Sequence, residues 1–393
     1  MRKIRWKNVI IALIALGLTI YLLSWVIGLV KGLFKPKDTS GFTACNLTNA
    51  KLSEKFTDKE YQGWIEMSDY VFYGENLTFY TETYTPDVAN AFVGKTLVLV
   101  DVCTGNEIVL DKVEDRLDGQ FDVSTIPAGF YEVYMEENLV RKRLYTNNKF
   151  ETDDEPFYTV TRNGMNKKIE VFADKALLNK DTATEDVLKD HFVFINVTEE
   201  VAPEGYYDIM LNPGPLGITN TESATGNGVT EASELYQFAV KVKNGLEEKG
   251  YRVALSRDGG EALSTYGEGG TVAAGFDKQV KYLIDFGMYE ASAKAGGMYV
   301  TYSSYVKNTL AKSIYDAISE GTPLTGTDLS KSARRGVYDS DFDIREAGGL
   351  ALGAGTYSDA EKVNEFAATN RHGMECVCVE FINTKNATDA QNW

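Results

Sequence analysis

Two glutamates and a pair of cysteines in the C-terminal half carry side chains that could do chemistry. Glu231 opens a segment with helical spacing, and Glu380 ends the apolar run Cys376–Glu380. Two carboxylates in one cleft could divide the roles of general acid and general base in a hydrolysis. Cys376 and Cys378 would face the same side of a strand as Glu380, because alternate residues point the same way. As Cys-x-Cys they could bind a soft metal ion, but the pattern favours small buried hydrophobic residues.

The elements that would position Glu231 form one βαβ unit. Tyr206–Leu211 predicts a buried strand, and Asn212-Pro213-Gly214 predicts a turn at its carboxyl end, where open α/β sheets place their ligands. The next segment predicts a helix that ends at Gly250, and Tyr251–Ser256 predicts the following strand. Apolar residues at helical spacing give the helix one buried face: Leu235, Phe238, Ala239, Val242 and Leu246.

Predicted helices and strands alternate to the end of the chain. The segments 273–294 and 306–320 have helical spacing, and 359–370 predicts a short helix. Met298–Tyr302 and Cys376–Glu380 predict strands. This alternation predicts an α/β domain with a central, mostly parallel sheet flanked by helices.

From about Phe192 onward the chain resembles the catalytic domain of zinc-dependent N-acetylmuramoyl-L-alanine amidases. That family reads D-P-G-H-G-G after its first strand, a Glu at the start of the first helix, G-x-x-V-x-x-T-R-D, then S-I-H-A-N and V-E-x-G-F-I-S-N. The corresponding segments here are NPGPLG, Glu231, GYRVALSRD, VTYSS and VEFINTKNATD. The resemblance implies a hydrolase fold that acts on the amide between muramic acid and L-Ala in peptidoglycan, with a catalytic zinc.

The resemblance also assigns roles to single positions. The family holds zinc with two histidines and a glutamate, and a late glutamate is the general base. The two histidine positions fall on Pro215 and Tyr302, whereas Glu231 retains the glutamate ligand and Glu380 the base, here vestigial. Because one carboxylate cannot hold a catalytic zinc, no metal and no cofactor is expected. The residues predicted to line the cleft are Asn212, Pro215, Tyr302 and Ser304.

The N-terminal segment and the net charge indicate where the protein works. The formal net charge is −17, and an acidic protein lacks the basic footprint that nucleic acid requires, so no nucleic-acid partner is expected. Val9–Val30 is apolar and uncharged, long enough to cross a bilayer core of about 30 Å, so it predicts a transmembrane helix rather than a cleaved signal peptide. The flanking charges favour the N-terminus inside. The expected localisation is the bacterial cell membrane, single-pass, with the body extracytoplasmic.

Short β-rich runs separated by turn signals lie between the apolar segment and the amidase-like part. They predict an all-β immunoglobulin-like sandwich, in which Cys45 and Cys103 could pair if oxidised. The runs are 77–84, 96–102, 107–113, 131–136, 157–162 and 168–174. The predicted domains are a cytoplasmic tail and anchor (1–37), a linker (38–53), the β-sandwich (54–178), a second linker (179–191) and the amidase-like domain (192–393).

These patterns predict a membrane-anchored cell-wall protein whose amidase-like domain is a zinc-less, non-catalytic pseudoenzyme. Its expected partners are a peptidoglycan stem peptide or a cell-envelope protein. One alternative is an active peptidoglycan amidase with a metal site rebuilt from Glu231, Glu380 and His372. Another is an adhesive protein that acts through the β-sandwich. His191, the other of the two histidines, is expected to be structural.

Overall fold

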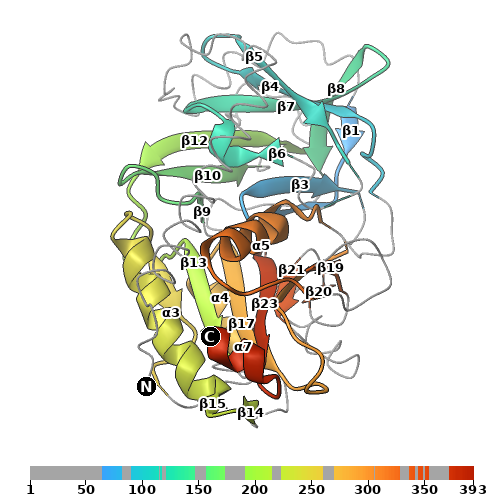
Figure 1. Cartoon of the computed structure of the whole chain (residues 1–393). Coiled ribbons are helices and arrows are strands. Elements are labelled where there is room, and N and C mark those ends of the chain that lie inside the picture. The colour runs from blue at the N-terminus through green and yellow to red at the C-terminus, as the bar shows by residue number, and fades with distance from the viewer. Residues whose placement is uncertain are drawn as a thin grey trace. The chain divides into compact units, whose positions relative to one another are not determined.

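The computed structural model describes residues 64–81, 90–114, 116, 121–146, 156–172, 191–214, 223–259, 270–304, 306–327, 336–340, 344–347, 350–353 and 371–393. The described chain forms two compact units that divide between Glu204 and Gly205. Figure 1 shows the labelled elements of both units.

The first unit is built from strands. Its larger sheet contains β1 (Trp64–Glu66), β4 (Thr96–Asp101), β5 (Glu107–Lys112), β7 (Gly129–Glu137), β8 (Val140–Thr146), β9 (Phe157–Tyr158), β10 (Asn166–Phe172), β11 (His191–Phe192) and β12 (Phe194–Glu200). Strand β1 pairs with β8 in parallel, and the neighbouring pairs are antiparallel. Strands β2 (Asp69–Tyr73), β3 (Asn76–Tyr80) and β6 (Phe121–Asp122) form an antiparallel ladder, followed by the 3-10 helix η2 (Val123–Thr125).

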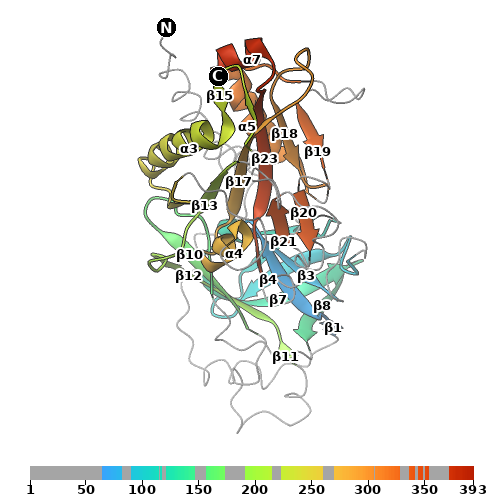
Figure 2. The same cartoon turned by 90° about the horizontal axis from the view of Figure 1, so that it is seen from below.

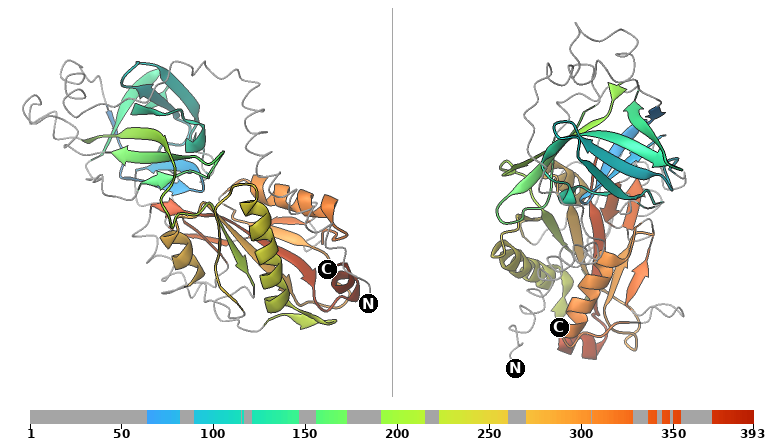
Figure 3. Two further views of the ribbon diagram at one scale, coloured as in Figure 1. Left: turned by 90° about the vertical axis from the view of Figure 1, so that its left-hand side faces the viewer. Right: turned by 90° about the horizontal axis from the view of Figure 1, so that it is seen from above.

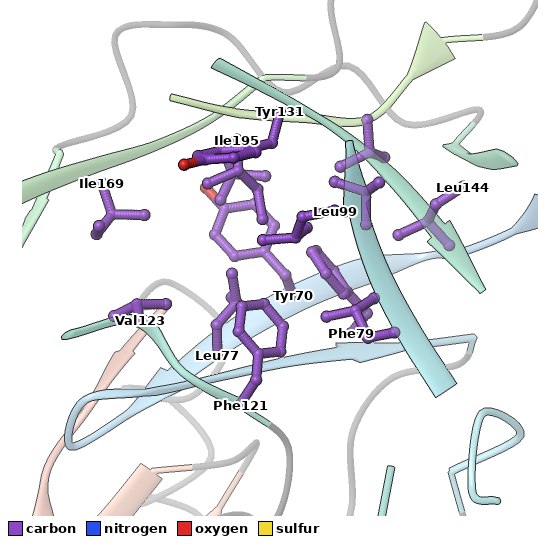
Figure 4. Packing of buried hydrophobic residues seen from close by; sticks show 14 of the residues in the cluster. Tyr70, Leu77, Phe79, Leu99, Phe121, Val123, Tyr131, Leu144, Ile169 and Ile195 are labelled. Atoms are coloured by element: carbon purple, nitrogen blue, oxygen red, sulfur yellow. The ribbon is translucent and has the colours of Figure 1, made fainter. Parts of the chain in front are cut away.

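One hydrophobic core holds this first unit together. Strands β2 and β3 contribute aromatic side chains, and Phe72 stacks on Phe157 with the ring centroids 4.0 Å apart. Figure 4 shows Leu99 of β4 and Ile195 of β12 in the same cluster as Leu77 of β3. Because β11 and β12 pair with β8, β10 and β7, residues 191–200 belong to this unit.

The second unit is organised around a six-stranded mixed sheet. Its order is β16 (Val253–Leu255), β13 (Ile209–Pro213), β17 (Tyr282–Tyr289), β23 (Glu375–Asn383), β18 (Tyr299–Tyr302) and β19 (Val337–Asp339). Strands β16, β13, β17 and β23 pair in parallel, β18 is antiparallel to β23, and β19 is parallel to β18. Two strand pairs, β14 (Thr225–Gly226) with β15 (Val229–Thr230) and β20 (Ile344–Ala347) with β21 (Leu350–Gly353), and the short β22 (His372–Gly373) complete the described strands of this unit.

The helices of the second unit are α3 (Glu231–Glu247), α4 (Thr271–Asp277), α5 (Thr309–Gly321) and α7 (Ala387–Asn392). Helix α3 buries the apolar stripe predicted from its spacing. Its Phe238 ring lies 5.2 Å from Phe286 of β17 and 5.0 Å from Phe381 of β23. Figures 2 and 3 show α3 alongside the sheet. Helix α4 lies against other residues of the sheet, since a Cβ on Gly275 would fall 3.1 Å from the Cε of Met210.

The predicted fold class is wrong. The described residues are mostly strands in mixed sheets with few helices, rather than an immunoglobulin-like sandwich followed by a central parallel sheet flanked by helices. One physical cause is the connection 290–298 between β17 and β18. It is shorter than the dozen or more residues that a parallel crossover needs, so β18 returns antiparallel.

The segment 273–294, predicted to be a helix, is also corrected. It contains the end of α4 and the whole of β17. The break follows from Gln279, whose φ of 47° no helix accommodates.

The predicted single-pass membrane localisation is corrected as well. Along the described chain, no helix combines the length and the apolar character that a bilayer span requires. The segment Val9–Val30, on which that prediction rested, lies outside the described residues.

Candidate functional site

The ends of β13, β17 and β23 bring the two predicted glutamates together. These strands are parallel, so their carboxyl ends form one edge of the sheet, here called the carboxyl edge. Glu380 of β23 lies opposite Gly287 of β17. Glu231, the first residue of α3, accepts a hydrogen bond from the Met288 amide at 3.0 Å. The two carboxylates therefore adjoin neighbouring residues of β17, Glu231 at Met288 and Glu380 at Gly287.

Glu231 is fastened to the backbone on both of its oxygens. Its second oxygen, Oε2, accepts from the amide of Ala224 at 2.9 Å, and the residue is only 3% exposed. Gly214 approaches so closely that a Cβ there would lie 2.6 Å from Oε1. Burial raises the pKa of Glu231, although the two amide hydrogen bonds and the charge of Arg257 oppose that rise. This carboxylate joins the start of α3 to the ends of β13 and β17.

Arg257 fixes the turn that follows β13. Its Nε donates to the carbonyl of Pro213 at 3.0 Å, and its Nη2 donates to the carbonyls of Gly214 at 2.6 Å and Ala232 at 2.9 Å. Burial lowers the pKa of Arg257, while the charges of Tyr236 and Glu231 raise it. The guanidinium thus links the turn after β13 to the first turn of α3, and its positive charge acts on Glu231.

Glu380 is half-buried beside a row of tyrosines. A Cβ on Gly287 would lie 2.6 Å from its Oε1, so the carboxylate rests against the backbone of β17. Tyr299 is the direct partner of Glu380 across β18 and β23 and shares its face of the sheet. The Tyr299 ring lies 5.3 Å from that of Tyr289 and 6.4 Å from that of Tyr338. We call Tyr289, Tyr299 and Tyr338 the tyrosine row.

Tyr289 of the tyrosine row interacts electrostatically with Asp389 and Glu380. Its hydroxyl donates to the carbonyl of Gly297 at 2.8 Å. Burial first, and then the charges of Asp389 and Glu380, raise the pKa of Tyr289 to about 12. At neutral pH this phenol is therefore a hydrogen-bond donor and not a base.

Asn212 belongs to a buried network below the carboxyl edge. Its Nδ2 donates to Asp285 Oδ1 at 2.8 Å, and its Oδ1 accepts from Ser256 at 2.6 Å. Asp285 also accepts from the thiols of Cys376 and Cys378, at 3.8 and 3.4 Å. These side chains share the sheet face of Glu380, because Asn212 pairs with Asp285 and Asp285 pairs with Cys378.

The other predicted cleft residues are not brought to the two glutamates. Tyr302 pairs with Val377, so its side chain lies on the opposite face of the sheet from Glu380, nearer the amino end of β23. Ser304 comes two residues after Tyr302, beyond the end of β18 and still further from Glu380. Pro215 lies outside the described residues.

His191 lies in the first unit, and His372, the histidine of the second unit, does not reach the carboxyl edge. His191 pairs with Thr146 in the first unit. His372 precedes Glu375, where β23 begins and where the Glu375 amide bonds the carbonyl of Lys281. Glu375 and Glu380 are five residues apart on an extended strand, roughly 16 Å. His372 is therefore at the other end of the sheet from Glu380.

The zinc that the resemblance implies does not fit the donors present. A catalytic zinc needs three protein ligands and an open fourth position. Both oxygens of Glu231 are occupied by backbone amides, and His372, the histidine of the second unit, lies at the other end of the sheet. The described side chains there suit hydrogen bonding and stacking better than metal coordination.

Sequence reasoning missed the residues that β17 contributes. Gly287, Met288 and Tyr289 lie between the glutamates, in a segment that was predicted to be helical. The signal was the run Tyr282–Tyr289, which is apolar apart from Asp285 and is typical of a strand buried on both faces.

The sequence matches no model of a protein family and no curated protein. Solved structures that are similar to the chain include N-acetylmuramoyl-L-alanine amidase AmiC2 of Nostoc punctiforme, with 14% identity, a TM-score of 0.33, and coverage of 48% of this chain and 86% of that one. The catalytic domain of the amidase CwlV from Bacillus (Paenibacillus) polymyxa var. colistinus has 14% identity and a TM-score of 0.34, covering 47% and 85%. The CwlD amidase from Clostridioides difficile, in complex with the GerS lipoprotein, has 12% identity and a TM-score of 0.30, covering 47% and 86%.

This similarity extends over about half of the chain at low identity, and it assigns no role to any residue here. About half of the chain thus resembles the catalytic domains of N-acetylmuramoyl-L-alanine amidases.

Proposed function

We propose that the second unit is an amidase-like domain without catalytic zinc that binds peptide-bearing cell-wall glycan at its carboxyl edge. The observation that carries this proposal is the pair of glutamates, Glu231 and Glu380, at one strand end, with no histidine of the second unit beside them. Because Glu231 is tied to two backbone amides, Glu380 is the acid that would meet a ligand.

The tyrosine row supports binding rather than hydrolysis. Half-buried aromatic rings present an apolar face together with a polar edge, which suits sugar rings and the amides of a stem peptide. Glu380 beside Tyr299 would accept hydrogen bonds from ligand N–H or O–H groups. The negative charge of Glu380 favours ligand segments that carry an amino group, as stem peptides with a diamino acid do.

Co-sedimentation with purified peptidoglycan tests this proposal. We expect the purified chain to bind, and we expect Tyr299→Ala, Glu380→Gln and Gly287→Ala each to weaken binding by about tenfold, the loss of one good contact or about 1.4 kcal/mol. Gly287→Ala acts through Glu380, because the added methyl group would displace that carboxylate. The matched control is Tyr282→Ala, at the opposite end of β17, which should bind as the wild type does.

The same preparations also test for catalysis. Stem peptides should not be released from muropeptides, with or without added zinc. Zinc-dependent release that Glu380→Gln abolishes would show an active amidase, and equal binding by wild type and Tyr299→Ala would remove the proposed ligand site.

A further inference from the structure

The buried cluster below the carboxyl edge has the donors of a soft-metal site. Asp285, Cys376 and Cys378 are at most 1% exposed, and their ligand atoms all lie within 4.8 Å of one another. Both cysteines are free thiols. We propose that these three side chains bind one thiophilic divalent cation of the zinc type, at a place distinct from the edge formed by Glu231 and Glu380.

The two sulfur–oxygen distances in the cluster are close to those of a tetrahedral site. Zinc lies about 2.3 Å from thiolate sulfur and about 2.0 Å from carboxylate oxygen, so at a tetrahedral angle the sulfur and oxygen are about 3.5 Å apart. The measured separations from Asp285 Oδ2 are 3.8 Å to the sulfur of Cys376 and 3.4 Å to that of Cys378. The three ligands would therefore need little movement to close around an ion.

The strand geometry explains why these atoms converge. Cys376 and Cys378 are alternate residues of β23 and point to one face, and Asp285 is the direct partner of Cys378 on β17. Asn212 holds the other oxygen of the carboxylate through its amide at 2.8 Å, which fixes Oδ2 toward the sulfurs. A carboxylate that supports a metal is usually oriented by such a hydrogen bond.

The cluster is shielded from solvent. Helix α4 lies over this face, where a Cβ on Gly275 would fall 2.4 Å from the sulfur of Met374, which is two residues before Cys376 on β23. A divalent cation would compensate the charge of a carboxylate withdrawn from water. Three protein ligands leave the fourth position of a tetrahedral ion to a ligand from outside the protein, and an ion bound only by the folded chain contributes its binding free energy to folding. The ion would therefore clamp β17 to β23 beneath Glu380.

Cobalt(II) is a suitable probe, because cobalt–thiolate bonds absorb in the near ultraviolet. The purified chain is unfolded in guanidinium without reductant, so that the disulfide at Cys103 stays intact, and refolded anaerobically with cobalt(II). We expect one cobalt per chain with a thiolate charge-transfer band, displaced by zinc. Cys376→Ala and Cys378→Ala should each weaken binding by more than about 100-fold, since even outer-shell partners contribute roughly 10–100-fold.

Two further variants make the outcome decisive. Asp285→Asn should weaken binding but keep the thiolate band, and Glu231→Gln should change neither. A refolded wild-type chain without the thiolate band would overturn the proposed metal site. It would not bear on the glycan binding proposed for the carboxyl edge. Binding lost in Glu231→Gln and kept in Cys378→Ala would place the metal at the carboxyl edge, contradicting this site and the zinc-less function together. Thermal unfolding without metal checks that each variant folds, and a variant that does not fold is replaced by its serine counterpart.

Discussion

At the scale of the residue, the hydrogen bonds that each glutamate already makes within the protein decide whether it can meet a ligand. Glu231 and Glu380 were both predicted from sequence as site residues, and the structure places both at one strand end. Their roles differ for a reason that no sequence pattern contains. Glu231 is bonded to the amides of Ala224 and Met288, one from a loop and the other from a strand distant in sequence. Such partners become known only once β17 is placed beside α3.

The pH dependence of stability should report this fastening of Glu231. Burial raises its pKa in the folded state above the ordinary value of 4.5, so the folded chain holds this proton more tightly than the unfolded chain. Stability relative to Glu231→Gln should then be highest below that ordinary value, fall as the pH rises through the raised folded pKa, and stay level above it. Urea unfolding of both proteins across this range measures the difference. If the stability of the wild type relative to Glu231→Gln instead rose with pH, the folded state would favour the ionised carboxylate of Glu231 over the protonated acid.

At the scale of the element, amphipathic periodicity predicted secondary structure more reliably than apolar runs did. The stripe of α3 was predicted correctly because a charged outer face marks its register, and the strands on either side of it were predicted from short apolar runs that end at turn residues. Strand β17 was missed, because both of its faces are buried and its short, mostly apolar sequence fits helix and strand alike. Without β17, the second histidine position of the resemblance was assigned to Tyr302 on β18, across the sheet from Glu380.

Phe238 should be a major source of stability for the second unit. Its ring contacts Phe286, Phe381 and Trp393 at 5.2, 5.0 and 5.4 Å, joining α3 to two strands and to the end of α7. We expect Phe238→Ala to lower the free energy of unfolding by about 3–5 kcal/mol, the usual effect of deleting a buried aromatic ring. Gln237→Ala, at an exposed position one residue earlier, is the control and should change it by less than about 0.5 kcal/mol. Chemical denaturation compares the two, and similar effects would contradict the packing described here.

At the scale of the whole molecule, each of the two units of the described chain has a hydrophobic core of its own. The core of the first unit draws on residues from Met67 to Val197, and none from beyond Glu204. The sequence resemblance began at about Phe192, yet β11 and β12 belong to the first unit. Their alternating apolar residues do not say which sheet they will join, since that choice depends on backbone partners in β7, β8 and β10.

Two separate cores predict two separately folding pieces. Residues 36–204 and 205–393, produced apart, should each unfold cooperatively on heating, because each keeps its own hydrophobic core. Reduction provides an internal control, since Cys103 is disulfide-bonded and lies in the first piece, whereas Cys376 and Cys378 are free thiols in the second. Loss of a native disulfide costs about 2–5 kcal/mol, so reductant should lower the melting temperature of the first piece alone. Scanning calorimetry of the two pieces, with and without reductant, measures this. A second piece that shows no thermal transition would mean that its core depends on the first unit.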